Sequence, residues 1–210
     1  MIKDIKEIVL IFASYKEVNS LLYQSSIIFK KIKPDYYIGN YKNLQIKVYI
    51  CGIGYDYVNS FLNNFEVVED ALIIKVGTCA VIDPSIDILL DFVPKIVSFK
   101  TKSINITNLE KFDLINEIIK EKIIDKKLFT IKFPLINKEK SEEFLNIGYS
   151  FVDMETFYFI EKFKNSTIFP LIIGTDRGDG NAKRDFLNNI SKASNKLKDS
   201  LMLMFKKIID

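Results

Sequence analysis

The sequence predicts an α/β protein, a three-layer α/β/α single domain over residues 1–210 with a mixed, mainly parallel central sheet. Apolar runs of strand length alternate with segments of helical spacing along the chain, which is the pattern of strand–helix–strand units. Runs such as Ile8–Ala13 and Ile168–Thr175 are apolar at nearly every position, as in strands that are covered on both faces. With 210 residues, 48% of them hydrophobic, and only five Pro and eight Gly, the chain fits one domain without a linker.

The first half of the chain is expected to begin with a strand, a helix and a hairpin. After the first apolar run, Val18, Leu21 and Leu22 recur at helical spacing, and Lys42 and Asn43 form a short polar turn between two later runs. The expected elements are a strand over Ile8–Ala13, a helix over Tyr15–Ile32, strands over Tyr36–Tyr41 and Leu44–Cys51, a helix over Asp56–Phe65, and a strand over Ala71–Val76 that ends at Gly77. The helix over Asp56–Phe65 connects the strands on either side of it as a crossover, which implies that these two strands are parallel.

The second half continues the same alternation. Pro134 is expected to close a strand, because proline has no backbone N–H to give to a sheet, and Phe186, Ile190, Leu197 and Leu201 mark an apolar stripe on a long last helix. The expected elements are strands over Ile88–Phe99, Leu128–Phe133, Gly148–Val152 and Ile168–Thr175, and helices over Asn108–Lys122, Ser141–Asn146, Glu155–Lys164 and Arg184–Ile209.

Charge and composition exclude several classes of protein. The 30 basic and 27 acidic residues are interspersed, so the net charge of +3 leaves no basic patch for a nucleic acid. No apolar segment is as long as a membrane span, and the start of the chain lacks the features of a signal peptide. Cys51 and Cys79 are the only cysteines, which favours a reducing compartment. We therefore expect a cytoplasmic protein without a membrane or nucleic-acid partner.

The chain contains no histidine, which is the commonest general base and the commonest metal ligand. This excludes Ser-His-Asp and Cys-His catalysis and the usual zinc sites. Acid and base chemistry must therefore use carboxylates, Lys, Tyr or Cys, and we expect neither a metal nor a cofactor.

Two acids follow strand-like runs and are the candidates for a site. Glu155 comes after Phe151-Val152-Asp153-Met154, and Asp176 comes after Leu171-Ile172-Ile173-Gly174-Thr175. In open α/β sheets, ligands bind beyond the carboxyl ends of the strands. Taken alone, either acid is explained equally well as the N-cap of the next helix.

Five short motifs occur in an order that resembles the nucleoside phosphorylase and nucleosidase superfamily. The motifs are Glu17-Val18 at the first helix, Cys51-Gly52-Ile53-Gly54, Gly77-Thr78-Cys79-Ala80, Val152-Asp153-Met154-Glu155, and Gly174-Thr175-Asp176 followed by Asp185-Phe186. The resemblance covers nearly the whole chain and is closest to the 5'-methylthioadenosine and S-adenosylhomocysteine nucleosidases.

The resemblance implies a role for each matching residue. Asp176 would donate a proton toward purine N7, which requires burial to raise its pKa, and Glu17 would be the base that activates water. Glu155 would accept hydrogen bonds from the ribose hydroxyls. The remaining expected substrate contacts are Met154 under the sugar, Phe133 stacked on the base, and Gly77 and Thr78 beside the sugar. Glu17 has a plain alternative, that of an exposed first-turn acid that complements the helix dipole.

The chain departs from the family pattern in three places. Ala80-Val81 replaces a pair that contains glycine, and Ile172 stands where the nucleosidases usually carry an Arg. The third departure is the short, basic loop from 177 to 184. Arg177 and Arg184 in this loop are therefore candidates for binding an anion such as phosphate. Lys75 is a third candidate, because it matches the position where some hexameric phosphorylases carry an anion-binding Arg, although a strand-end lysine that reaches solvent explains it more simply.

Three functions follow from these observations. The leading one is hydrolysis of 5'-methylthioadenosine or S-adenosylhomocysteine to adenine and a thioribose, as in methionine salvage. A phosphate-dependent purine or uridine phosphorylase and a non-catalytic nucleoside-binding protein are the alternatives. The family resemblance also implies a homo-oligomer, with a dimer favoured.

Overall fold

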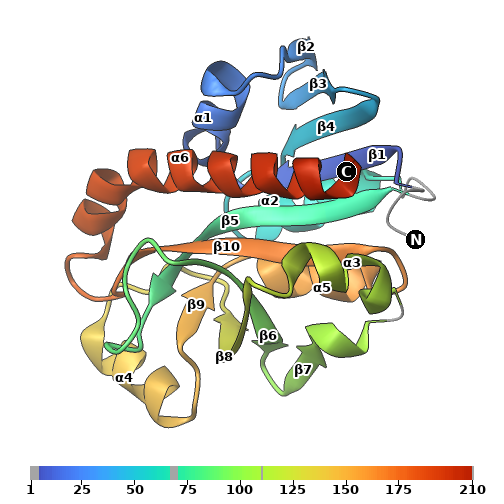
Figure 1. Ribbon diagram of the computed structural model, residues 1–210. Coiled ribbons are helices and arrows are strands. Elements are labelled where there is room, and N and C mark those ends of the chain that lie inside the picture. Colours follow the sequence, from blue (N-terminus) through green and yellow to red (C-terminus); the bar gives the residue numbers. More distant parts are fainter. Residues whose placement is uncertain (1–4, 67–70, 110, 210) are drawn as a thin grey trace.

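The computed structural model describes residues 5–66, 71–109 and 111–209, which form a ten-stranded mixed sheet with flanking helices (Figure 1). The elements are β1 (Glu7–Phe12), α1 (Tyr15–Gln24), β2 (Lys30–Lys33), β3 (Tyr36–Tyr41), β4 (Leu44–Ile50), α2 (Tyr55–Asn64), β5 (Leu72–Val81), β6 (Asp91–Phe99), β7 (Lys102–Asn105), the 3-10 turn η2 (Ile106–Asn108), α3 (Phe112–Ile119), β8 (Ile123–Thr130), α4 (Lys138–Asn146), β9 (Phe151–Asp153), α5 (Thr156–Phe163), β10 (Ile168–Asp176) and α6 (Ala182–Ile209).

Strand β5 is the junction of the sheet. On one side it pairs in parallel with β1, which pairs with β4 and so leads to the hairpin of β3 and β2. On the other side it pairs in parallel with β10 and antiparallel with β9. Because β10 continues through β6 and β8 back to β9, the strands β5, β10, β6, β8 and β9 close into a ring. The strands are mixed as expected, and the ring is an addition to the expected sheet.

The direction of β9 decides how Glu155 reaches the sheet. Glu155 follows the carboxyl end of a strand, as expected from the sequence. Strand β9 runs antiparallel to β5, with Val152 opposite Ala80, so the chain after Asp153 runs back along β5. Asp176 lies in the parallel strand β10 and also pairs with Ala80. The two acids therefore approach the same part of β5 from two sides.

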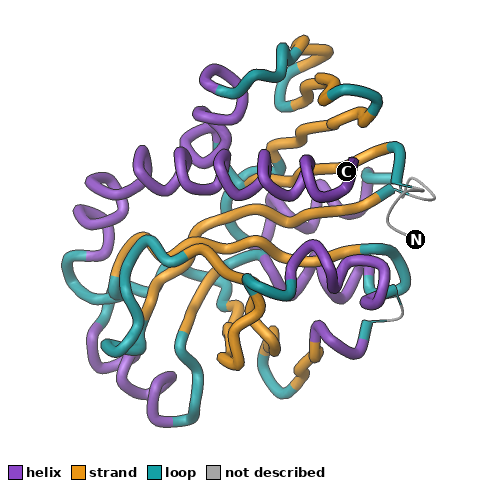
Figure 2. The backbone as a smooth tube through the Cα atoms, viewed as in Figure 1, coloured by secondary structure: helices purple, strands orange, loops and turns teal. Residues whose placement is uncertain are grey.

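Helices cover β5 and β10 on both sides. Helix α6 packs against both strands and is contacted by α1 and α3, whereas α5 contacts β10 and α2. In Figure 1, α6 crosses in front of β5 and α2 lies behind it, and the same arrangement of helices and strands is visible in the tube of Figure 2. No helix in the described part of the chain is long and apolar enough to cross a membrane.

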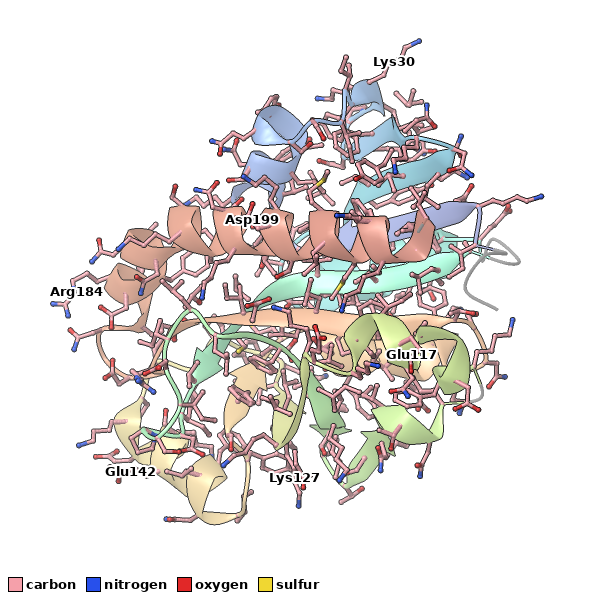
Figure 3. The ribbon with its side chains drawn as sticks, in the orientation of Figure 1. Lys30, Glu117, Lys127, Glu142, Arg184 and Asp199 are labelled. Atoms are coloured by element: carbon pink, nitrogen blue, oxygen red, sulfur yellow. The ribbon has the colours of Figure 1, made fainter. Side chains whose placement is uncertain are left out.

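The core follows the continuous apolar runs of the sequence. Every residue of β10 is buried, and so is every residue of β5 except Thr78. Gly174 lets the two strands approach, because a Cβ atom at this position would lie 2.2 Å from the Cγ2 atom of Val81. Charged side chains of both signs cover the exterior, as Figure 3 shows for Lys30, Glu117, Lys127, Glu142, Arg184 and Asp199.

Several expected element boundaries were wrong. Helix α1 ends at Gln24, because Ser25 has an extended backbone (ψ 167°) and its hydroxyl donates to the carbonyl of Leu21 (2.6 Å). Strand β5 continues through Gly77 to Val81, since the partner strands β10 and β9 extend beside it. Strand β8 begins earlier than expected and stops at Thr130. Residues 102–108 form β7 and a 3-10 turn, so α3 starts only at Phe112.

Candidate active site

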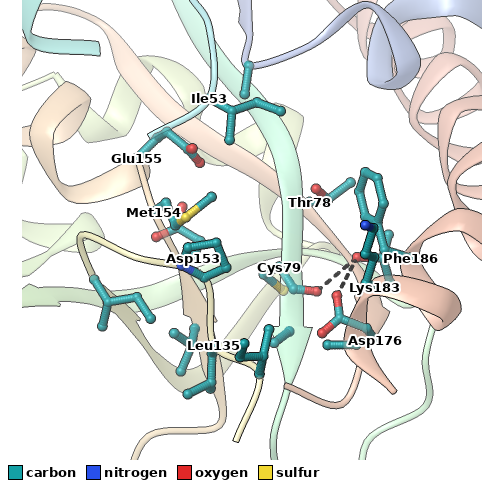
Figure 4. Close-up of a pocket in the computed structure, with 18 of the residues that line it drawn as sticks. Ile53, Thr78, Cys79, Leu135, Asp153, Met154, Glu155, Asp176, Lys183 and Phe186 are labelled. Atoms are coloured by element: carbon teal, nitrogen blue, oxygen red, sulfur yellow. Dashed lines mark hydrogen bonds between the residues drawn. The ribbon is translucent and has the colours of Figure 1, made fainter. Parts of the chain in front are cut away.

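A cavity of about 580 Å³ lies beside the carboxyl-terminal half of β5 (Figure 4). Its walls come from the start of α1, the turn after β4, the loop after β8, the connection from β9 to α5, the end of β10 and the start of α6. This volume is within the range of sites for small molecules. Six of the ten predicted site residues line this cavity, namely Glu17, Thr78, Phe133, Met154, Glu155 and Asp176, and Gly77 directly precedes Thr78 in β5.

Glu17 lines the cavity from the first turn of α1 and is only 4% exposed. Its Oε2 atom accepts hydrogen bonds from the backbone N–H groups of Ala13 (3.0 Å) and Ser14 (2.9 Å), as in a capping box. Its Oε1 atom accepts from the N–H (3.0 Å) and hydroxyl (2.9 Å) of Thr78. The side chain thus caps a helix, but it is buried in the cavity wall and joins α1 to β5.

Glu155 lines the cavity from the connection between β9 and α5 and is 5% exposed. Its Oε1 atom accepts the N–H of Gly54 (2.9 Å), which the turn of Gly52 and Gly54 presents with φ values of +88° at both glycines. Burial raises the pKa of Glu155 to about 7, although the nearby Lys75 acts in the opposite direction.

Asp153, not Glu155, caps helix α5. Its Oδ2 atom accepts the N–H of Thr156 (2.9 Å) and also the hydroxyl of Thr156, while its Oδ1 atom accepts the hydroxyl of Thr130 (2.7 Å). Glu155 directly precedes the helix but makes no side-chain bond to it. The helix-cap interpretation that was open for Glu155 therefore belongs to its neighbour.

Asp176 stands across the cavity from Glu155 (Figure 4). Its Oδ1 atom accepts the N–H of Gly178 (2.9 Å) and its Oδ2 atom accepts the hydroxyl of Thr175 (3.0 Å), so it caps a local turn and no helix. Burial raises the pKa of Asp176 to about 6, and Asp185 and Asp179 act in the same direction. The environment of Asp176 therefore favours a protonated carboxyl at mildly acidic pH.

The remaining wall is mostly apolar. Met154 and Ile53 lie near Glu155, and Leu135 and Phe186 border the opposite side (Figure 4). Phe133 also lines the cavity, but its side chain is 77% exposed, so it stands at the rim. A flat apolar ligand fits this wall, with its polar groups toward the carboxylates.

The three predicted anion-binding residues do not line the cavity. Arg177 directs its guanidinium at the carbonyl oxygens of Asp83 (3.1 Å) and Ile86 (3.0 Å), and Arg184 is exposed beside Asp185. Lys75 is 1% exposed, so it does not reach solvent as the simpler interpretation required. Lys183 is the one basic side chain that the structure places in the cavity lining among the residues it describes.

Ile172, which stands at the position of the usual Arg, is fully buried within β10. Ala80 lines the cavity, and Val81 beside it packs against Gly174. The described residues contain no group of three or more Cys, Asp or Glu arranged to hold a metal ion.

No family model matches the sequence, and no curated protein matches it by sequence. Solved structures do match. A variant of the MTAN from Chlamydia trachomatis bound to MTA has a TM-score of 0.78 at 19% identity, covering 97% of this chain and 99% of that one. A mutant Helicobacter pylori MTAN with 5'-methylthioadenosine in its active site gives 0.76 at 17% identity, with coverages of 96% and 99%. The MTA/SAH nucleosidase of Streptococcus pneumoniae in complex with 8-aminoadenine gives 0.75 at 14%, with coverages of 95% and 99%.

The chain has the fold of the MTA/SAH nucleosidases. The fold expected from the sequence motifs is thereby confirmed over nearly the whole chain. At these identities the match establishes the nucleosidase fold and leaves the chemistry to be argued from the residues of this cavity.

Several lining residues were missed by sequence reasoning within this nucleosidase fold. Ser14, Asp153, Thr175 and Lys183 all line the cavity. Thr175 and Asp153 adjoin the two acids that were singled out, so their positions carried a usable signal. Lys183 belongs to the basic loop from 177 to 184, but nothing in the sequence distinguishes it from Arg177 or Arg184 in that loop.

Proposed function

We propose that this protein is a nucleosidase that hydrolyses the N-ribosidic bond of 5'-methylthioadenosine or S-adenosylhomocysteine, releasing adenine and a thioribose. One observation carries the proposal. Glu17, Glu155 and Asp176 are buried around a single cavity of nucleoside size, with Asp176 across the cavity from Glu155, and burial raises the pKa of Asp176 to about 6 and that of Glu155 to about 7. The fold agrees, since structures with this fold are MTA/SAH nucleosidases with MTA or adenine bound.

The proposed reaction needs both an acid and a base. Breaking the bond between a purine and C1' of ribose leaves negative charge on the purine and cationic character on the sugar. Protonated Asp176 would give its proton to purine N7 as the C–N bond breaks. Water would form the new bond to C1' and lose a proton to Glu17.

The other residues would hold the substrate. Glu155 would accept hydrogen bonds from ribose hydroxyls, with Thr78 and Gly77 beside the sugar. Met154 would pack under the ribose ring, and Phe133 would close over the base from the rim. The 5' substituent would lie against the apolar wall.

The cation content of the cavity favours water over phosphate as the nucleophile. A phosphorylase must hold an anion with several positive groups. Arg177 and Arg184 do not line the cavity, Lys75 is buried in β5, and Lys183 is an exposed side chain at the start of α6. This arrangement gives phosphate few direct partners among the residues that the structure describes.

The test is to incubate the purified protein with 5'-methylthioadenosine, with and without phosphate, and to measure free adenine. Adenine released without phosphate supports the proposal, and strict dependence on phosphate selects the phosphorylase instead. No turnover under either condition, together with tight binding by calorimetry, selects a binding protein. Asp199→Asn, an exposed residue on α6, is the matched control for Asp176→Asn.

We further propose that the protein acts in the cytoplasm as a homodimer, in a pathway such as methionine salvage that disposes of the thioribose nucleoside. Light scattering coupled to size exclusion measures the mass in solution. A mass near 24.3 kDa, that of one chain, contradicts the dimer.

A further inference from the structure

Lys75 is the one basic side chain that is buried in the part of the chain that the structure describes. It lies in the middle of β5, is 1% exposed, and is not among the residues that line the cavity. Its Nζ atom donates to the carbonyl of Val76 (3.0 Å) and lies 5.9 Å from the ring centroid of Phe159. Burying an ammonium group is costly unless opposite charges compensate it.

The compensating charges are the carboxylates of the candidate site. The acids that act on Lys75 are, in order of strength, Glu155 and Glu17, with Cys51 and Asp153 contributing less. Burial alone would lower the pKa of Lys75, but these neighbours outweigh burial and raise it. Lys75 therefore stays charged behind the cavity wall.

Gly77 provides the space that brings the ammonium group to this place. A Cβ atom at Gly77 would lie 2.6 Å from Nζ of Lys75 and 3.7 Å from Oε1 of Glu17. The missing side chain thus lets the lysine fold back over its own strand toward Glu17. The space for Lys75 therefore explains why a glycine suits position 77, independently of any contact with substrate.

We propose that Lys75 is a positioning residue that supplies the compensating charge for Glu17 and Glu155 from behind the cavity, while Asp176 lies outside its influence. The consequence for catalysis rests on the proposed hydrolysis: without Lys75, burial would raise the pKa of Glu155 further above about 7, and less of Glu155 would be the carboxylate that holds the sugar. Lys75 itself touches neither substrate nor the reacting atoms.

The surroundings of the acids agree with this division. Burial, Asp153 and Glu17 raise the pKa of Glu155. Lys75 and the hydrogen bond from the N–H of Gly54 act in the opposite direction and lower it. The groups that act on Asp176 are the N–H of Gly178, the hydroxyl of Thr175, and the acids Asp185 and Asp179. None of these is a cation.

The experiment is a titration of glutamate side-chain carboxyls by ¹³C NMR in the wild type, Lys75→Met and Lys75→Arg. The Glu155 signal is assigned by its loss in Glu155→Gln, and Lys30→Met on exposed β2 is the matched control. We expect Lys75→Met to move the Glu155 titration up by about one pH unit or more, because an opposite charge close by is lost. Lys75→Arg should restore most of the shift. An unchanged Glu155 titration in Lys75→Met overturns the proposal.

Gly77→Ala is the second variant, for use if Lys75→Met does not fold. It keeps the lysine and displaces its ammonium group, so the Glu155 titration should move in the same direction by a smaller amount, and an unmoved titration overturns the proposal. The NMR measurement needs no turnover. If the wild type has no hydrolase activity but the Glu155 titration shifts, the proposed function fails and the role of Lys75 stands. If the wild type hydrolyses substrate but the titration does not shift, only the role of Lys75 fails.

Discussion

The two ends of the cavity hold the same chemical group in opposite environments. At one end, Glu17 accepts hydrogen bonds from backbone N–H groups and a hydroxyl, and Glu155 has Lys75 behind it. At the other end, Asp176 is buried with two further acids nearby. Burial raises the pKa of both acids, to about 7 at Glu155 and about 6 at Asp176, so the two ends differ in what opposes burial: a buried cation at Glu155, and a backbone N–H and a hydroxyl at Asp176. The comparison teaches that a site without histidine can still contain groups that titrate near neutral pH.

The largest expected effect comes from removing the acid. Asp176→Asn keeps the shape of the side chain but has no acidic proton to give to the purine. We expect kcat for methylthioadenosine to fall by roughly 10²- to 10⁴-fold, the usual contribution of a general acid. Steady-state release of adenine measures this change. Asp199→Asn should retain wild-type kcat, and an Asp176→Asn variant within threefold of wild type would remove Asp176 from the mechanism.

Removing the base should reduce both activity and stability. In the wild type, both carboxylate oxygens of Glu17 accept hydrogen bonds from backbone N–H groups. Glu17→Gln replaces one of these oxygens with an NH₂ group, so at least one buried donor loses its acceptor. We expect kcat to fall by roughly 10²-fold or more and the free energy of unfolding to fall by about 1–3 kcal/mol. Urea denaturation measures the second change. Glu117→Gln, an exposed residue on α3, is the control and should alter neither quantity.

The pH dependence of kcat/KM tests both ends at once. The pKa of about 6 at Asp176 requires activity to fall as pH rises above 6, because the free enzyme then loses the acidic proton. The pKa of about 7 at Glu155 requires activity to fall as pH decreases below 7 if the ribose is held by a carboxylate. Because the acid has the lower of the two pKa values, only a minor fraction of the enzyme carries both required states at any pH, and we expect a bell with its maximum between about 6 and 7. A flat profile from pH 5 to 8 would contradict the assignment of both groups.

The sequence predicted the central strands of the sheet better than the ring that closes through β9. The runs at β1, β5 and β10 are apolar at nearly every position, and this pattern predicts buried strands. The ring closure depends on β9, which has three residues, and on its antiparallel direction beside β5. A segment this short carries no periodicity from which its direction can be read. The sequence therefore could not predict from which direction the chain brings Glu155 to the cavity, although it did identify Glu155 as a candidate site residue.

The candidate site shows a similar division. The acids and Met154 were found through motif order, and the structure brings them together around one cavity. The position of Lys75 could not be predicted, because a lone lysine in an apolar strand usually reaches solvent. The acids that compensate it come from α1 and from the connection before α5, and only the folded chain brings them beside β5.

The smallest effect is the most specific, because neutralising Asp176 should stabilise the folded protein whereas neutralising Glu17 should destabilise it. The folded-state pKa of Asp176 is raised from 3.8 to about 6, so the folded protein loses stability as pH rises from about 4 to 6. Asp176→Asn removes this cost. At pH 8 we expect its free energy of unfolding, measured by urea denaturation, to exceed that of the wild type by about 1–3 kcal/mol. The advantage should vanish at pH 4, where the wild-type carboxyl is protonated when folded. Glu17→Gln should be less stable than wild type at pH 8, so a matching loss in Asp176→Asn would mean that the two ends of the cavity do not differ as the structure indicates.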